Sequence, residues 1–547
     1  MQRQLSALAS QPFDVLIVGG GMYGAAMARE AATRGLKTAL IEQADFCSGT
    51  SANSLKIIHG GLRYLQQADL PRVFESIRER SILLRTAPHL VAPMPCLMPT
   101  RGWLMKSRLV MFAGMLANDI LSCWRNRHLD PLRHLPNGGT LSRRAILDIV
   151  PQLSDTSITG AARWFDGFAY DTERLVVGIV KAAAEAGAEV ANYVRLQSLR
   201  LEGNRVVGAV AQDRLTGETF DIRAAYVVNA AGPWIGQVLD QFGRALTQPA
   251  PHAALGMNLI VRNWPVQTHA LALQSPHQSR LYFFVPWRGA VMAGTYYREY
   301  TGSADDLRVT EDDIRSYLDA LNSCLPGAAL TPDDILGIQL GIIPSRKPAR
   351  PDREPALLRH YKLIHHARSD GIQGLFSICG IKYTTARGVA AQVVGAIARH
   401  LNKTIGPSIT PHTPLPGGDL PDLAAYQREL AAARPDIPVG QLEHLIALYG
   451  TEARDILAQA ATLSGPEPLL RAQCLMAIRE EMPQTLGDLL YRRLGQATGQ
   501  PLPPDQLRAA AETMAAERQW SADRLEAEIS SAGRVTTYWQ AATRPVP

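Results

Sequence analysis

Residues 13–42 read FDVLIVGGGMYGAAMAREAATRGLKTALIE, and this stretch decides how the rest of the chain is interpreted. A strand-like apolar run, Val15 to Val18, enters the pattern G-x-G-x-x-G at residues 19–24, which opens an alanine-rich helix. A second short strand, Thr38 to Ile41, ends in Glu42. The order of strand, glycine turn, helix, strand and acidic residue is typical of a dinucleotide-binding unit.

Each part of this pattern has a physical role in holding a dinucleotide. Gly19 allows the tight turn, Gly21 lets the backbone approach a pyrophosphate, and Gly24 lets the helix pack closely on the strand. The helix N-terminus offers free N–H groups and positive potential to the phosphates. Glu42 stands where a carboxylate accepts hydrogen bonds from a ribose. An ordinary glycine turn is the alternative, but the strand–helix–strand context favours the dinucleotide.

Length and composition indicate a globular protein of two or three domains, with 547 residues, 46% of them hydrophobic and 19% charged. The 56 Lys and Arg exceed the 50 Asp and Glu by six. This mild positive balance fits an anionic substrate or an anionic membrane surface, and we expect no nucleic acid partner. The six cysteines are scattered without a C-x-x-C pair, so we expect no metal site, no disulfide framework and a reducing compartment.

Two features bear on membranes. The N-terminal stretch MQRQLSALASQP lacks the apolar core of a secretory signal, and no run reaches the roughly 20 apolar residues needed to span a bilayer. The most apolar segment lies within residues 101–127, where basic residues flank the run 109–117. It is either a helix in a membrane interface or a helix buried against a neighbouring domain. We expect a cytoplasmic protein that binds peripherally to the inner face of the cytoplasmic membrane.

A second informative segment follows the glycine pattern. Small hydroxyl residues crowd positions 48–54, and HGGLRY at 59–64 gathers a titratable base, two glycines, a cation and an aromatic ring. These residues look like the lining of the reacting end of a cofactor. Residues 19–65 closely resemble the FAD-dependent glycerol-3-phosphate dehydrogenase and oxidase family, of the aerobic, quinone-linked type. The residues that match its T-S-x-x-S-x-K-x-I-H-G-G-L-R-Y-L motif are Thr50, Ser51, Ser54, Lys56, Ile58, His59, Gly60, Gly61, Leu62, Arg63, Tyr64 and Leu65.

Later segments extend the resemblance. NAAGPW at 229–234 looks like the family segment that returns the chain to the FAD, and DTERL at 171–175 is similar to its D-x-x-R-L helix start. GIKYTTAR at 380–387 resembles G-G-K-L-T-T-Y-R, which implies that Thr384 and Thr385 lie at the flavin ring and that Lys382 reaches the substrate. Arg359 matches the family arginine before an aspartate–tyrosine pair.

Two positions depart from the family pattern. GTYY at 294–297 replaces G-T-T-D, and Ile343 stands where the family places a substrate-binding arginine. A phosphate dianion with too few donors leaves its desolvation cost uncompensated. Arg346, three residues further on, is our candidate replacement. We favour glycerol 3-phosphate as substrate, and another small anionic hydroxy or amino acid is the alternative.

The resemblance implies an α/β fold with a split dinucleotide-binding (Rossmann-like) FAD domain, an inserted antiparallel-sheet substrate domain and a C-terminal helical domain. Runs at 258–261, 281–286 and 291–296 predict strands of the inserted sheet, and runs at 196–201 and 206–212 predict a hairpin. The middle segment, 76–150, is interpreted as helices and basic loops. We assign residues 12–75, 150–245 and 371–402 to the FAD domain, 76–149 and 246–370 to the substrate domain, 403–420 to a linker, and 421–547 to the helical domain.

The implied reaction is the oxidation of sn-glycerol 3-phosphate to dihydroxyacetone phosphate, with hydride transfer to flavin N5 and electrons passed to a quinone. His59 is the candidate base, because histidine exchanges protons near neutral pH. Arg63, Arg359 and Lys382 would bind the anionic substrate and stabilise developing negative charge. The sequence leaves open whether the acceptor is a quinone or oxygen, whether the chain forms a homodimer, and whether it is instead an FAD-stabilised binding protein without turnover.

Motifs and resemblance together give three groups of candidate site residues and no metal ligand. The catalytic candidates are His59, Arg63 and Lys382. The substrate-binding candidates are Arg63, Tyr64, Arg346, Arg359 and Lys382. The candidates for binding FAD are Gly19, Gly21, Gly24, Glu42, Thr50, Ser51, Lys56, Val194, Ala231, Gly232, Gly380, Thr384 and Thr385.

Overall fold

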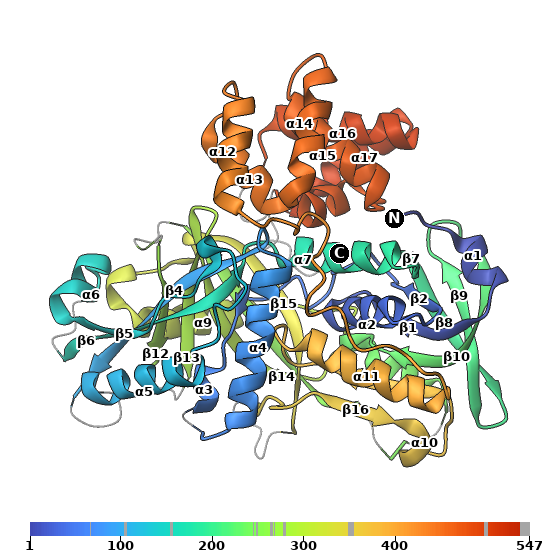
Figure 1. Cartoon of the computed structure of the whole chain (residues 1–547), viewed down its shortest axis with the longest axis horizontal. Coiled ribbons are helices and arrows are strands. Elements are labelled where there is room, and N and C mark those ends of the chain that lie inside the picture. The colour runs from blue at the N-terminus through green and yellow to red at the C-terminus, as the bar shows by residue number, and fades with distance from the viewer. Residues whose placement is uncertain are drawn as a thin grey trace.

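The structure is a computed structural model that describes residues 1–65, 67–102, 107–153, 157–243, 246–247, 250–262, 266, 268–276, 280–347, 355–496 and 502–535. Two β-sheets with their covering helices lie beside one another, and the C-terminal helices form a third group above them in the view of Figure 1.

The first sheet holds the predicted dinucleotide unit. Its parallel core runs in the order β17-β10-β1-β2-β7, and β16 closes one edge antiparallel to β17. The core strands read as nearly continuous apolar runs, as expected for parallel strands covered on both faces. The strands are β1 (Phe13–Val18), β2 (Thr38–Ile41), β7 (Glu189–Ala191), β10 (Thr219–Asn229), β16 (Lys362–His365) and β17 (Leu375–Cys379).

Three helices pack around this sheet: α2 (Met22–Thr33), α7 (Thr172–Glu185) and α11 (Ala386–His400). The predicted order of strand, glycine turn, helix and strand at 13–42 is confirmed as β1, α2 and β2. The predicted hairpin is confirmed as β8 (Val194–Glu202) and β9 (Arg205–Asp213), and β9 also pairs with the first half of β10.

Glycines let α2 approach the turn after β1. A Cβ atom at Gly24 would lie 1.8 Å from the Gly19 carbonyl oxygen. Gly19 itself has φ +112°, and a Cβ there would lie 2.6 Å from the carbonyl oxygen of Ala230 after β10. No side chain fits either position, so the N-terminus of α2 lies directly against the ends of two neighbouring strands.

The second sheet has nine strands in the order β15-β11-β14-β13-β12-β4-β6-β3, with β5 beside β6. All of its pairs are antiparallel except β12 with β4. The predicted strands at 258–261, 281–286 and 291–296 are confirmed within β11, β13 and β14. The strands are β3 (Ile57–Ile58), β4 (Val91–Arg101), β5 (Gly139–Ser142), β6 (Ile158–Ala169), β11 (His252–Val261), β12 (Ala270–Gln274), β13 (Leu281–Trp287), β14 (Ala290–Tyr300) and β15 (Ile335–Ser345).

The prediction of helices and basic loops for residues 76–150 is wrong for β4 and β5. Prolines at 93, 95 and 99 interrupt the usual strand signal of β4 because proline donates no N–H. They occupy alternate positions, so the missing N–H groups share one edge of the strand. β4 nevertheless pairs with β6 along its whole length, and with β12 at Cys96 and Leu97.

Sheet membership also differs from the predicted domain boundaries at three places. β3, assigned to the FAD domain, pairs with β6 in the second sheet. β6, assigned to the FAD domain, pairs with β4 in the second sheet. β16, assigned to the substrate domain, pairs with β17 in the first sheet. The local sequence of these strands does not specify which sheet they join, so the boundary depends on tertiary pairing.

The remaining helices near the sheets are α1 (Leu5–Ser10), α3 (Leu62–Leu65), α4 (Leu70–Thr86), α5 (Arg108–Leu121), α6 (Arg143–Ile149), α8 (Ile235–Asp240), α9 (Glu311–Cys324) and α10 (His366–Ser369). Within the described ranges, no helix combines the length and the apolar character needed to cross a membrane.

The predicted linker, 403–420, contains no helix or strand and runs along the first sheet's helices, where Thr410 Oγ1 donates to Glu30 at 2.7 Å. The helical C-terminal domain is confirmed for its described part, and residues 497–501 and 536–547 lie outside the described residues. It consists of α12 (Leu423–Ala433), α13 (Val439–Tyr449), α14 (Ala453–Thr462), α15 (Pro468–Glu480), a π-helical turn (Asp488–Arg493), α16 (Pro504–Arg518) and α17 (Ala522–Val535).

Buried ion pairs join this domain to α7. Arg174 Nη1 lies 2.5 Å from Glu481, and Lys181 Nζ lies 2.6 Å from both Glu452 and Glu480. In Figure 1 the C-terminal helices accordingly lie over α7.

We expect Gly24→Ala to lower the free energy of unfolding by about 3 kcal/mol, because the new methyl group meets a backbone oxygen that cannot move away. The matched control is Gly178→Ala in α7, where a Cβ would make an ordinary 3.9 Å contact with Leu415. That control should stabilise the protein slightly, by roughly 0.5–1 kcal/mol. Urea denaturation measures both, and equal effects of the two substitutions would contradict the close-approach argument.

Candidate functional site

A cavity of about 950 Å³ is lined by residues of both sheets. Because β1, β10 and β17 are parallel neighbours, the segments after their carboxyl ends meet at one edge of the first sheet. Those segments are the glycine turn at 19–23, residues 230–238 and residues 378–384, and all three line the cavity. The volume is at the upper end of the usual range for small-molecule and cofactor sites.

Glu42 borders one end of the cavity. Its Oε2 accepts a hydrogen bond from the Gly20 N–H at 2.6 Å and its Oε1 accepts one from the Ala44 N–H at 2.9 Å. Burial raises the pKa of Glu42. Near it, Ser51 Oγ accepts from the Met22 N–H at 3.1 Å, so a hydroxyl from the 48–54 segment lies at the start of α2.

Most of the residues predicted to bind the cofactor line this cavity: Gly19, Gly21, Glu42, Thr50, Ser51, Lys56, Val194, Ala231, Gly232, Gly380 and Thr384. Gly24 and Thr385 lie behind the lining. Gly24 provides the close helix approach, and Thr385 is the buried N-cap residue of α11.

Lys56 has a fully buried side chain, although the residue borders the cavity. Its Nζ donates to Glu173 Oε2 at 2.8 Å and to Thr172 Oγ1 at 3.0 Å. The ammonium group is thus neutralised by a carboxylate at the start of α7, which the sequence analysis did not identify. This ion pair ties the 48–59 segment to the helix that carries the C-terminal domain.

His59 lies in the cavity lining with its ring half-exposed. Its Nδ1 is 3.2 Å from Asp166 Oδ2 on β6, and its ring packs edge-on against Phe283 on β13, with centroids 5.6 Å apart. Asp166 is buried and also accepts from the Gly60 N–H at 2.6 Å and from Arg80 Nη1 at 2.6 Å. A carboxylate, a guanidinium and a backbone amide therefore fix the position of the His59 ring.

Asp166 is ionised at neutral pH. Burial alone would raise its pKa, but the hydrogen bond with His59 and the charge of Arg80 hold the pKa of Asp166 well below its usual range. An ionised Asp166 accepts the Nδ1–H of His59, so the Nε2 atom keeps its lone pair. The arrangement suits a general base that takes a proton at Nε2. The sequence signal for Asp166 was a carboxylate within the apolar strand WFDGFA.

Two predicted cations belong to the same cavity lining as this histidine. Arg63 and Lys382 both line the cavity, and Lys382 Nζ lies 4.0 Å from the ring centroid of Tyr64, another lining residue. Arg346 and Arg359 are exposed and do not belong to the lining, whereas Ile343 does. The Arg346 N–H donates to the Ala356 carbonyl at 2.8 Å.

Sequence reasoning missed several polar groups of the lining. Asn258 Oδ1 accepts from Thr295 Oγ1 at 2.9 Å, and Tyr297 occupies the place of the family's acidic residue. Tyr23 donates from its hydroxyl to the Lys382 carbonyl at 3.0 Å, and burial raises the pKa of Tyr23 to about 12, so it stays protonated. A buried asparagine in the apolar strand GMNLIV was the available signal for Asn258.

Across the described ranges, no group of three or more His, Cys, Asp or Glu side chains could hold a metal ion. The donor set of the cavity is instead glycine backbone, hydroxyls and one carboxylate at one end, with a histidine and two cations at the other. This set fits an extended anionic cofactor together with a small anionic molecule.

Comparisons with known proteins agree with this geometry. Residues 14–393 match the family described as FAD dependent oxidoreductase, and residues 408–525 match the family described as C-terminal domain of alpha-glycerophosphate oxidase. The chain is 32% identical over 514 residues to a glycerol-3-phosphate dehydrogenase of Synechocystis sp., with 90% of each chain covered. It is 31% identical to glycerol-3-phosphate dehydrogenase 2 of Mycobacterium tuberculosis, covering 96% of this chain and 88% of that protein.

A solved structure shares nearly the whole fold. The glycerol-3-phosphate dehydrogenase from Bacillus halodurans, complexed with FAD, matches with a TM-score of 0.76 and 26% identity. The match covers 97% of this chain and 96% of that one, so it includes both sheets and the C-terminal helices.

We expect Asp166→Asn to lower the free energy of unfolding by about 3–5 kcal/mol at pH 7, because it leaves the buried Arg80 without its counter-charge. The folded-state pKa of Asp166 is depressed, so this stabilisation is present above the unfolded-state pKa of about 3.9 and is lost as the pH falls through the folded-state value. Urea denaturation should therefore give a constant difference from wild type between pH 8 and about pH 5.

The control for this prediction is Asp221→Asn, because Asp221 pairs with Arg200 at the exposed surface. Its cost should stay below about 1 kcal/mol. An Asp166 variant no less stable than this control would show that the buried pair does not hold the site.

Proposed function

We propose, from the premise that this chain belongs to the FAD-dependent oxidoreductase family, that it is an FAD-dependent dehydrogenase of sn-glycerol 3-phosphate. The product is dihydroxyacetone phosphate. The observation that carries the proposal is His59, which is held by Asp166 and shares one cavity with Arg63, Lys382 and the dinucleotide turn. Relatives named glycerol-3-phosphate dehydrogenase that match nine-tenths of the chain support this substrate.

The residues present fit FAD. Gly19 and Gly24 leave no room for a side chain at the start of α2, so backbone N–H groups can approach a pyrophosphate. Glu42 borders the cavity where a ribose would lie. Gly380 and Thr384, after β17, line the cavity beside Lys382 and would face the ring system. When bound, FAD supplies the acceptor for the hydride removed from the substrate carbon.

The chain's own residues handle the proton and the charge. His59 Nε2 takes the hydroxyl proton as the carbon is oxidised. Asp166 holds the ring in the required tautomer and stabilises the positive charge that His59 gains, as a buried carboxylate does for a catalytic histidine. Arg63 and Lys382 bind the anionic group, and stacking on Tyr64 orients the Lys382 ammonium.

Within this function, the number of donors in the cavity bears on which anionic substrate is bound. Ile343 lines the cavity and adds no donor, and Arg346 lies outside the lining. A phosphate must therefore rely on Arg63, Lys382 and neighbouring neutral donors such as Tyr297. The apolar Ile343 favours, as the second candidate, another small anionic hydroxy or amino acid with fewer charges to satisfy.

The electron acceptor we propose is a quinone, reached through peripheral contact with the inner face of the cytoplasmic membrane. α5 buries Met111 and Met115 on the second sheet and exposes Leu109, Phe112, Leu116 and Ile120. Leu109 is 78% exposed. One face of the helix is thus buried and the other is an exposed apolar patch, which suits shallow insertion into a membrane interface.

The basic residues beside this patch differ in whether their side chains are exposed and can contact lipid. Arg108 and Arg127 are exposed and can meet anionic lipid. Arg125 is buried, with Nη2 3.1 Å from Asp119, so it serves the local structure. Residues 103–106, including Trp103 and Lys106 of the predicted membrane segment, lie outside the described residues.

Anaerobic addition of glycerol 3-phosphate should bleach the flavin absorbance of the FAD-loaded protein. His59→Asn should slow this reduction by about 10²–10⁴-fold with a much smaller change in substrate affinity, because the proton acceptor is lost. Stopped-flow absorbance measures both quantities. The control is His128→Asn, since His128 is exposed, lies outside the cavity lining and has φ +60°, which asparagine accepts.

Two results would contradict this assignment. An unchanged reduction rate in His59→Asn would remove His59 as the base. Bleaching by a non-phosphorylated hydroxy or amino acid, but not by glycerol 3-phosphate, would establish the second candidate.

For the membrane contact, we expect co-sedimentation with anionic vesicles that weakens as salt is raised. Replacing Leu109 and Ile120 by serine should reduce it strongly, because both side chains are exposed on the apolar face. Leu215→Ser and Val439→Ser alter exposed apolar residues elsewhere on the surface and should leave it unchanged. Equal binding to neutral and anionic vesicles, or no effect of the α5 substitutions, would rule out this mechanism.

A further inference from the structure

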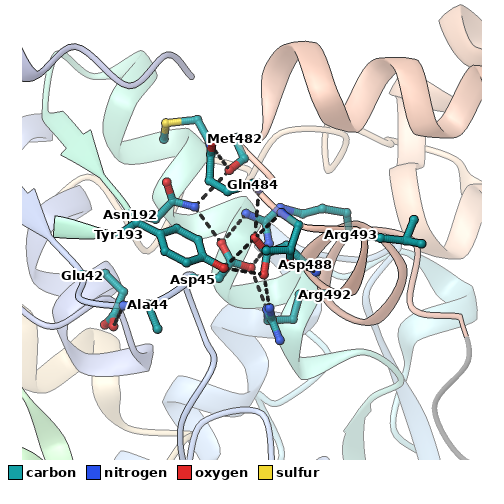
Figure 2. Close-up of polar contacts among 12 residues, drawn as sticks. Glu42, Ala44, Asp45, Asn192, Tyr193, Met482, Gln484, Asp488, Arg492 and Arg493 are labelled. Carbon is teal, nitrogen blue, oxygen red and sulfur yellow. Dashed lines mark hydrogen bonds and ion pairs between the residues drawn. The ribbon is translucent and has the colours of Figure 1, made fainter. Parts of the chain in front are cut away.

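A buried ion network joins the C-terminal domain to the segment that directly follows Glu42. Figure 2 shows Asp45 between the two consecutive arginines 492 and 493. Arg493 makes two parallel hydrogen bonds to Asp45, Nη1 to Oδ2 at 2.6 Å and Nη2 to Oδ1 at 2.8 Å. Arg492 Nε adds a third at 2.6 Å, and Asn192 Nδ2 a fourth at 2.9 Å.

Both members of the central pair are fully buried. The side chains of Asp45 and Arg493 have no exposed area, and the Arg493 guanidinium also donates to the Glu481 carbonyl from Nε at 3.0 Å and Nη2 at 2.8 Å. Burial alone would raise the pKa of Asp45, but the charges of Arg493 and Arg492 outweigh it and lower the pKa to about 2. The contact is therefore between charged groups held away from water, and neither charge has a substitute partner in solvent.

The network reaches the edge of the cavity within three residues. Glu42 lines the cavity, and its own backbone carbonyl accepts from the Val194 N–H at 2.7 Å. The Ala44 carbonyl accepts from the Tyr193 N–H at 2.9 Å. Tyr193 in turn donates its hydroxyl to the Asp488 carboxylate, with both oxygens 3.0 Å away, and Asp488 pairs with Arg492. The C-terminal domain thus binds both segments that form this backbone contact, one at Asp45 and the other at Tyr193.

Several residues at this contact have a left-handed backbone conformation. Cys47 has φ +60° and Tyr193 has φ +55°, although neither is glycine. On the facing side of the contact, Met482 has φ +57°. Such conformations are unfavourable for residues with a Cβ and persist only where surrounding contacts impose them. Without the network, the segment 42–48 would relax into a backbone conformation of lower energy.

We propose that Arg493 and Arg492 are positioning residues for FAD, acting through Asp45 to hold the segment after Glu42 in the conformation that binds the cofactor. This inference rests on the proposed function only in taking FAD as the molecule that lies against Glu42. Neither arginine lines the cavity, so their effect on FAD is indirect. The C-terminal domain is then a part of the cofactor site rather than a separate module.

The expected size follows from the population of the competent conformation. The apparent dissociation constant equals the intrinsic one divided by the fraction of molecules with the segment in place. If removal of Arg493 leaves about one molecule in ten competent, FAD affinity falls about tenfold. Binding of FAD must stabilise the docked C-terminal domain by the same factor, because the coupling is reciprocal.

The test is a titration of the full-length, FAD-stripped protein with FAD, followed by flavin fluorescence. We expect Arg493→Met to raise the dissociation constant at least tenfold. Arg492→Gln, which keeps a hydrogen-bond donor at a partly exposed position, should raise it less and decides the question if Arg493→Met does not fold. A second readout is proteolysis of the C-terminal domain, which FAD should slow in wild type and slow less in either arginine variant.

The matched control is Lys181→Met. It breaks the ion pairs of Lys181 with Glu452 and Glu480, which also dock the C-terminal domain, but it does not touch the segment 42–48. Its melting temperature should fall while its FAD dissociation constant stays within about twofold of wild type. An Arg493 or Arg492 variant that binds FAD as wild type does would overturn the proposal, and so would a Lys181 variant that loses as much affinity as the arginine variants.

Failure of the proposed function has a different signature. A wild type that binds FAD but is not reduced by glycerol 3-phosphate contradicts the substrate assignment, while the ratio of FAD dissociation constants, which needs no substrate, still decides the role of Arg493. A wild type that binds no FAD overturns both.

Discussion

The close approach of α2 to the turn after β1 is the constraint on which the site depends. With no side chain at Gly19 or Gly24, the helix begins against the ends of β1 and β10, and its N-terminal N–H groups face the cavity. Parallel pairing of β1, β10 and β17 then brings three segments that are far apart in the chain, 19–23, 230–238 and 378–384, to one edge of the sheet. The second sheet covers that edge and supplies Asp166 and Asn258.

Polar contacts with buried partners hold His59, Lys56 and Asp45 in place in this arrangement. Asp166 fixes the His59 ring, Glu173 neutralises Lys56, and Arg493 holds Asp45. For Asp166 with Arg80, Lys56 with Glu173 and Asp45 with Arg493, removing one partner would leave a charge in a medium that solvates it poorly, so the pair resists rearrangement. The site is therefore preorganised by residues that lie outside the reacting centre, as catalytic geometry requires.

The same architecture limits what the site can bind. Ile343, at the position where the family pattern has an arginine, lines the cavity. Arg346 does not belong to the lining, so it adds no cation there. In the proposed function the anion is held by Arg63 and Lys382, and charge is then the property that separates the two candidate substrates. On the outer surface, α5 buries one face on the second sheet and exposes apolar residues on the other face.

The sequence by itself determined the local elements and the family. Apolar periodicity and glycine spacing are properties of neighbouring residues, and they predicted β1, α2, β2, the β8–β9 hairpin, three strands of the second sheet and the helical C-terminal domain. The long motif at 50–65 carried the resemblance that the comparisons confirm.

Only the tertiary structure decided which elements pair and which charges meet. The prolines of β4 concealed its strand pattern, and the sheet membership of β6 depends on its partner β4, which lies more than 50 residues earlier in the chain. His59 meets Asp166 across 107 positions and Asp45 meets Arg493 across 448. No local pattern specifies such contacts, because they result from the burial of several elements together, which selects one partner for each charge that loses its water.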